Sequence, residues 1–175
     1  MNIATIKWVD IANGVGCRVS IFVSGCRHHC PGCFNEEAWD FNFGEAYTPQ
    51  LEQQILQGLA PSYIHGLSLL GGEPFEVENQ RELVNLLKKA KELYPQKNIW
   101  CYSGFTYEEL TGERPSRARC DLTDEMLSYI DVLVEGRFVE ELKDISLRFR
   151  GSSNQRILDL PQSLAAKTPI WWKEQ

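Results

Sequence analysis

The 175-residue sequence predicts an α/β fold: an open, partial (β/α) barrel whose strands are mainly parallel. Apolar, β-branched runs alternate with amphipathic, helix-like segments, which is typical of parallel strands joined by crossover helices. A closed barrel of eight such units usually needs about 250 residues. This chain has roughly half that number of units. We therefore expect a single domain over residues 1–175 whose barrel stays open.

Five segments rich in apolar and β-branched residues are predicted to be strands. They cover residues 18–24, 66–70, 98–102, 131–135 and 155–159. Four helices are predicted between them, over residues 49–59, 78–94, 106–110 and 123–129. The first begins with Thr48 as N-cap and Pro49 in its first turn, and the second has leucines on one face and lysines on the other. The polar loop 111–121 and the tail 161–175 have no predicted role.

Composition narrows the class of protein. Hydrophobic residues make up 43% of the chain and charged residues 24%, which is ordinary for a globular protein. The net charge of −6 argues against a general nucleic-acid binder, which carries a basic surface. No apolar run is long enough to cross a membrane, and the N-terminus lacks the features of a signal peptide. We expect a cytoplasmic protein that binds neither nucleic acid nor membranes.

A polar or glycine-containing motif follows each of the first four predicted strands. These motifs are a cysteine loop, Gly-Gly-Glu-Pro at 71–74, Tyr-Ser-Gly at 102–104 and Glu-Gly-Arg at 135–137. The carboxyl ends of parallel strands meet at one edge of a sheet, where such folds carry their chemistry. The four motifs are therefore expected to form one site.

The cysteine loop has the spacing C-x3-C-x2-C, with Cys26, Cys30 and Cys33. Iron–sulfur clusters are usually held by four cysteine thiolates. A 4Fe–4S cluster held by three leaves one iron without a protein ligand, free to bind a substrate or cofactor. This spacing therefore suits a cluster that takes part in chemistry.

Other interpretations of the cysteines stay open from the residues alone. A zinc site needs four ligands; His28 or His29 could be the fourth, but the chelate would be cramped and the chain has no second C-x2-C pair. A disulfide is disfavoured in a reducing compartment. The remaining cysteines are expected to be buried small hydrophobes: Cys17, Cys101 and Cys120.

The other motifs offer polar groups at the same edge. Gly71 and Gly72 allow the backbone to approach a ligand closely, or simply to turn. Glu73 adds a carboxylate suited to an ammonium group. Ser103 could bond a ribose or a carboxylate, and Glu135 is either a ligand contact or a solvated charge.

The cysteine spacing and the following Gly-Gly-Glu-Pro together resemble the radical S-adenosylmethionine superfamily. Within it, residues 13–18 and 22–26 resemble the glycyl-radical-enzyme activases. Segments 30–35, 132–138, 142–144 and 150–155 resemble the activases of the anaerobic (class III) ribonucleoside-triphosphate reductase. The resemblance covers most of residues 5–158. Val15 and Cys17 depart from the usual proline and threonine, but neither change removes a cluster ligand.

This resemblance implies a radical-SAM type of fold and a chemistry. Cys26, Cys30 and Cys33 would hold a 4Fe–4S cluster whose open iron binds S-adenosylmethionine, with Gly71 to Glu73 at its ammonium group. Further cofactor contacts would come from Phe34, Ser103 and Glu135. Reductive cleavage of S-adenosylmethionine, with an electron from a donor such as flavodoxin, would generate a glycyl radical on the anaerobic ribonucleoside-triphosphate reductase.

The segment 150–155, Arg-Gly-Ser-Ser-Asn-Gln, follows the fourth predicted strand and could line the open side of the barrel. Arg150, Ser152 and Asn154 would then contact the partner protein; otherwise the segment closes the sheet edge. Two other functions stay open. One is a small radical enzyme acting on a free metabolite, like the deazaguanine-forming synthases, although this segment counts against it. The other is a non-catalytic metal-binding or electron-transfer module.

Overall fold

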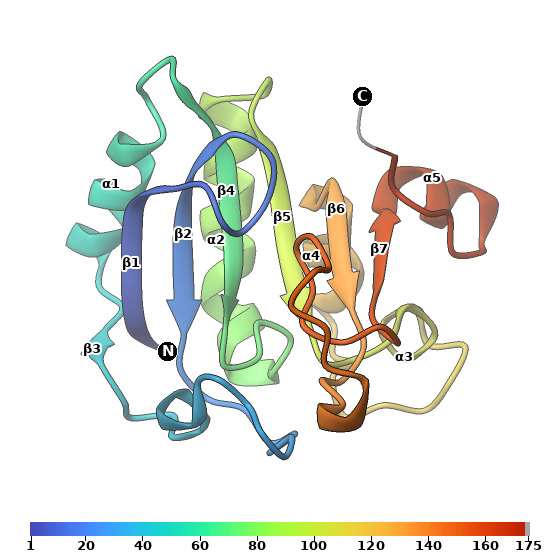
Figure 1. Cartoon of the computed structure of the whole chain (residues 1–175). Helices are drawn as coiled ribbons and strands as arrows, with labels where there is room; N and C mark the ends of the chain where they lie inside the picture. The colour runs from blue at the N-terminus through green and yellow to red at the C-terminus, as the bar shows by residue number, and fades with distance from the viewer. Residues whose placement is uncertain (174–175) are drawn as a thin grey trace.

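The computed structural model describes residues 1–173 and contains one open, seven-stranded sheet (Figure 1). The strand order is β3-β1-β2-β4-β5-β6-β7, so the two edge strands do not meet. The strands are β1 (Asn2–Asp10), β2 (Cys17–Val23), β3 (Glu45–Ala46), β4 (Ile64–Gly71), β5 (Asn98–Ser103), β6 (Val132–Glu135) and β7 (Arg156–Asp159). The five predicted strands correspond to β2, β4, β5, β6 and β7.

Parallel pairing is confined to the centre of the sheet. Strands β2, β4, β5 and β6 pair in parallel, as predicted. Strands β1, β3 and β7 run antiparallel to their neighbours. The link between β6 and β7 is an irregular loop with one short 3-10 turn, so the chain returns in the opposite direction. The sheet is open and its central strands are parallel, as predicted, whereas strands β1 and β3 at one edge were not predicted.

The helices are α1 (Pro49–Gly58), α2 (Val77–Leu93), α3 (Tyr107–Thr111), α4 (Thr123–Tyr129) and α5 (Leu160–Ala166), with 3-10 turns η1 (Glu36–Trp39) and η2 (Glu140–Leu142). Helices α1, α2 and α4 cover one face of the sheet (Figure 1). The Thr48 side chain accepts a hydrogen bond from the Leu51 N–H, which confirms the predicted N-cap. The tail predicted from 161 onward instead contains most of α5. None of the described helices is long and apolar enough to span a membrane.

Two apolar clusters hold the layers together. The larger one packs the helices onto the sheet and includes Ile21, Leu69 and Leu87. The smaller one lies around Trp100 and includes Phe149 and Trp172, which approach that ring at 5.2 and 5.0 Å between centroids. The part of the tail up to residue 173 therefore packs against the sheet, and residues 174–175 lie outside the described residues.

Candidate functional site

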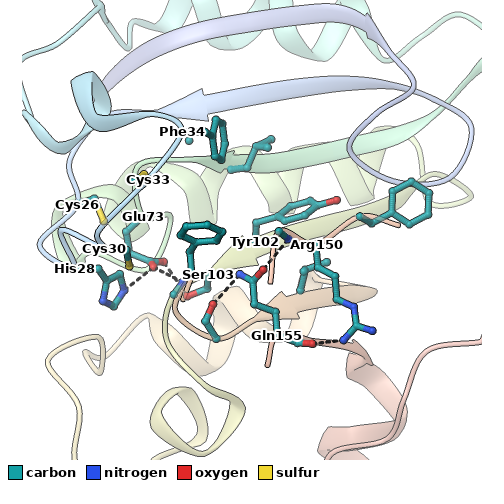
Figure 2. A pocket seen from close by; sticks show the side chains of 18 of the residues that line it. Cys26, His28, Cys30, Cys33, Phe34, Glu73, Tyr102, Ser103, Arg150 and Gln155 are labelled. Atoms are coloured by element: carbon teal, nitrogen blue, oxygen red, sulfur yellow. Dashed lines mark hydrogen bonds and ion pairs between the residues drawn. The ribbon is translucent and has the colours of Figure 1, made fainter. Parts of the chain in front are cut away.

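A cavity of about 480 Å³ lies where β2, β4, β5 and β6 end (Figure 2). Its volume is in the usual range for small-molecule sites. Its walls bring together motifs that are far apart in the sequence. The predicted site residues that line it are Cys26, Cys30, Cys33, Phe34, Gly71, Gly72, Glu73, Ser103 and Arg150. Glu135, Ser152 and Asn154 are not among its lining residues.

The cysteine loop leaves β2 and folds back on η1. The Cys26 N–H donates to the Trp39 carbonyl at 3.2 Å. Gly32 has φ 71°, a left-handed conformation that favours glycine, and a Cβ there would lie 2.7 Å from the Glu140 carboxyl carbon. The Asn35 N–H donates to the Cys33 sulfur at 3.5 Å. Hydrogen bonds of this kind to sulfur tune iron–sulfur clusters.

The donor chemistry of the loop fits a cluster. All three thiols line one cavity, and thiolate is the form of cysteine that binds metal. Burial, with the nearby Glu73 carboxylate, raises the pKa of Cys26 to about 12, and burial also raises the pKa of Cys30. Iron would therefore have to displace the protons of these thiols on binding. Among residues 1–173, no three His, Cys, Asp or Glu side chains are gathered closely enough to bind a single metal ion.

The Glu73 carboxylate is fully buried and holds several segments together. One oxygen accepts from the Phe75 N–H and the Ser103 hydroxyl, each at 2.9 Å. The other accepts from the Gly104 N–H at 2.8 Å and lies 2.9 Å from His28 Nε2 (Figure 2). The carboxylate predicted to meet an ammonium group is thus already bonded to four groups of the protein.

The two glycines before Glu73 are needed for close packing. A Cβ on Gly71, whose φ is 109°, would lie 2.6 Å from the Val23 nitrogen. A Cβ on Gly72 would lie 2.6 Å from the Gly25 carbonyl oxygen. The end of β4 therefore lies directly against the start of the cysteine loop, and only glycine permits this distance.

Glu135 lies at the end of β6 with 1% of its surface exposed. It forms an ion pair with Arg156, which also pairs with Glu108 at 2.8 Å. Burial raises the pKa of Glu135 despite this partner. A solvated charge at this position is excluded, and the carboxylate bonds to the protein itself.

The segment 150–155 is bonded to the chain's own backbone. Arg150 donates to the Gln155 carbonyl at 2.5 Å (Figure 2). Asn154 donates to the Arg137 carbonyl at 2.9 Å, and the buried Ser152 hydroxyl accepts from the Val139 N–H at 3.2 Å. These contacts hold the segment to the rest of the loop between β6 and β7, and Arg150 also lines the cavity.

Two side chains at the site were not among the predicted cluster or cofactor contacts. The Tyr102 hydroxyl is buried at the cavity and has no hydrogen-bond partner within residues 1–173. His28 bonds to Glu73, which is 45 positions away in the chain. The only sequence signal for His28 was its place between two cysteines.

Comparison with known proteins first gives a class. Residues 12–158 match the family model described as a 4Fe-4S single cluster domain. An open α/β sheet with a three-cysteine loop at the ends of its parallel strands is thus an iron–sulfur domain of this class.

Relatives then give the particular family. The chain is 40% identical over 149 residues to the anaerobic ribonucleoside-triphosphate reductase-activating protein of Escherichia coli K12, covering 84% of this chain and 91% of that protein. Proteins of the same name match from Haemophilus influenzae, at 40% over 159 residues (90% and 97% covered), and from Enterobacteria phage T4, at 37% over 157 residues (90% and 93%). The chain belongs to the family of anaerobic ribonucleoside-triphosphate reductase-activating proteins, so the resemblance seen in its motifs is confirmed.

Proposed function

We propose that this protein generates a glycyl radical on an anaerobic ribonucleoside-triphosphate reductase, with S-adenosylmethionine as the source of the radical. One observation carries the proposal. In a chain whose relatives are named activating proteins of that reductase, three cysteines and a Gly-Gly turn line one cavity. Cys26, Cys30 and Cys33 would hold the 4Fe–4S cluster.

When bound, the cluster would pass one electron, from a donor such as flavodoxin, to the S-adenosylmethionine sulfonium, whose S–C5′ bond would break to give methionine and a 5′-deoxyadenosyl radical. A hydrogen atom taken from a glycine α-carbon of the reductase would leave 5′-deoxyadenosine and the glycyl radical. The chain's own task is to bind, orient and shield the reactants. Leu70, Val134 and Phe149 give the cavity apolar walls, which limit side reactions with water.

The proposal extends to the arrangement of the cofactor and the fold. The Gly71–Gly72 backbone would lie at the methionine end of S-adenosylmethionine, with Glu73 holding that turn and Ser103 beside it. Phe34, which is 83% exposed at the cavity, would lie against the bound cofactor. The open sheet would be the partial barrel of the radical-SAM type, formed as one domain from residues 1–175. All six cysteines are free thiols, which suits a reducing cytoplasm.

Electron paramagnetic resonance tests this function. The protein, reconstituted anaerobically with iron and sulfide and then reduced, should produce a glycyl radical signal on its matched reductase when S-adenosylmethionine is added. A reductase variant without its radical glycine should give no signal. Turnover of a free small molecule with no radical on the reductase would instead favour a metabolite-modifying enzyme. A cluster that does not respond to S-adenosylmethionine would indicate an electron-transfer module.

A further inference from the structure

His28 is held between two groups that fix its tautomer. Its side chain is 3% exposed, and its Nε2 atom lies 2.9 Å from a Glu73 carboxylate oxygen (Figure 2). Its Nδ1 atom lies 3.4 Å from the Arg117 guanidinium. Because arginine can only donate hydrogen bonds, Nδ1 is the acceptor and Nε2 carries the proton that is donated to Glu73.

The ring also has little room to turn. It meets Phe105 edge-on, at 4.4 Å between ring centroids. A Cβ on Gly104 would lie 2.6 Å from a ring carbon of His28. The Arg117 guanidinium lies over the Phe105 ring, 4.6 Å from its centroid. Arg117 belongs to the loop 111–121, for which no role was predicted, so this loop holds the histidine in place.

A second contact joins the cysteine loop to the turn after β4. Glu76 accepts from the Arg27 backbone N–H at 2.9 Å and from the Arg27 side chain at 2.6 Å. Arg117 pairs with the same carboxylate at 3.1 Å. The cysteine loop is thus attached to the turn after β4 through two neighbouring residues, Arg27 and His28. Of these two side-chain contacts, that of His28 reaches Glu73, which directly follows the glycine turn and whose own N–H donates to the Gly25 carbonyl at 2.8 Å.

We propose that His28 is a positioning residue that sets the cysteine loop relative to the Gly71–Gly72 turn, and thereby the cluster relative to S-adenosylmethionine. This inference rests on the proposed function. His28 lies two residues from both Cys26 and Cys30, and its partner Glu73 adjoins Gly72. Without the N–H donor, the three cysteines would still hold iron. The Gly71–Gly72 turn would keep its backbone contact with the start of the loop at Gly25 but would lose the side-chain contact that lies between Cys26 and Cys30.

Four variants test the role of this hydrogen bond. His28→Ala removes the donor. His28→Gln keeps an N–H at about the same reach, whereas His28→Asn is one methylene shorter and should not reach Glu73. His29→Ala is the matched control, because His29 is exposed and stacks on Trp39, with ring centroids 4.6 Å apart. Each protein is reconstituted, and its iron content, S-adenosylmethionine affinity and electron paramagnetic resonance spectrum are measured.

We expect His28→Ala and His28→Asn to keep most of their iron and to bind S-adenosylmethionine about tenfold more weakly, as for the loss of one charge-assisted hydrogen bond. The change that S-adenosylmethionine causes in the spectrum of the reduced cluster should also shrink. His28→Gln and His29→Ala should resemble the wild type. If His28→Ala does not fold, the comparison of His28→Gln with His28→Asn tests the role of the hydrogen bond.

Wild-type affinity and spectra in His28→Asn would overturn the inference, as would an equal loss in the Gln and Asn variants. Loss of iron from His28→Asn with retention in His29→Ala would also overturn it, because His28 would then act on the cluster itself. A wild-type protein whose cluster ignores S-adenosylmethionine would instead refute the proposed function, so the two failures can be told apart.

Discussion

At the scale of single residues, the six cysteines differ in what surrounds their sulfur atoms. Cys26, Cys30 and Cys33 line the cavity. Cys101 is fully buried in the core, and burial raises its pKa well above the usual value. The remaining two, Cys17 and Cys120, are only partly buried, less than expected for small core residues. Cavity lining, and not burial alone, therefore distinguishes the proposed ligands.

Replacing any one of the loop cysteines by alanine should reduce bound iron and sulfide to near zero after reconstitution, because each thiolate is expected to be a ligand. Iron and sulfide analysis with the visible absorption spectrum measures this. Cys17→Ala is the control and should keep the cluster. Cys101→Ala should also keep it while losing about 1 kcal/mol of stability, because a buried group is removed. Retained iron in Cys30→Ala with loss in Cys101→Ala would show that the ligands are misassigned.

Glu73 shows which features of a single residue the sequence could predict and which it could not. The position of a carboxylate after a predicted strand could be recognised, and the structure places it at the cavity. Its bonding partners could not be recognised, because His28, Ser103 and Gly104 are brought to it only by the packing of β2, β4 and β5. A motif identifies residue types near a site. Hydrogen-bond partners depend on the fold.

At the scale of elements, a strand could be predicted from the sequence where most of its residues are buried. The central strands are covered on both faces, so they read as continuous apolar runs: β2 is almost entirely buried. Strand β1 has only two buried residues among nine, and its apolar positions are interrupted by exposed ones. Strand β3 has two residues, both exposed. Such edge elements are stabilised by their pairing and leave little pattern in the sequence.

The C-terminal segment after α5 makes contacts that its composition alone did not indicate. The Trp172 N–H donates to the Ile157 carbonyl at 2.9 Å, and Trp171 forms a bridge with Leu158. This segment therefore covers part of the outer edge of β7, which would otherwise be free to pair with another chain. The two tryptophans differ, because Trp171 is 52% exposed and Trp172 is partly buried against Trp100.

Trp172→Ala should lower the free energy of unfolding by about 2 kcal/mol, because it removes apolar contact area and an edge-on aromatic pair. Trp171→Ala, the neighbouring control, should cost less than about 1 kcal/mol, as for most exposed positions. Urea unfolding followed by circular dichroism gives both values. Equal losses in the two variants would mean that the Trp172–Trp100 contact contributes nothing specific.

At the scale of the whole molecule, ion pairs connect segments that are distant in the sequence. Arg27 in the cysteine loop pairs with Glu78 at the start of α2 at 2.6 Å. Lys91 near the end of the same helix pairs with Asp131 before β6 at 2.6 Å. The first contact joins the edge that carries the cavity to the helical layer, and the second does the same at the opposite edge, where β5 and β6 begin. The chain has 24 acidic and 18 basic residues, so protonation of the carboxylates at low pH changes its net charge.

Two of these carboxylates have a clear direction of pKa shift. Hydrogen bonding to Arg27 lowers the pKa of Glu78 to about 2, and Arg119 in the same way lowers the pKa of Asp124. The folded pKa of each lies below its unfolded value, near 4. The stability they provide is therefore complete above about pH 5 and is lost as the pH falls toward 2. Burial raises the pKa of Glu135, which acts in the opposite direction.

We therefore expect the free energy of unfolding to decrease between pH 5 and pH 2.5, and to decrease less in 0.5 M salt, because both lowered carboxylates are exposed and their pairs are screened. Denaturant titrations at several pH values measure the slope. Glu78→Gln should flatten it by removing the group that titrates. Glu92→Gln should leave it unchanged, because Glu92 is an exposed carboxylate on the same helix with no ion pair in residues 1–173. If Glu78→Gln and the wild type lost stability in parallel over this range, the Arg27–Glu78 pair would not couple the cysteine loop to α2 in solution.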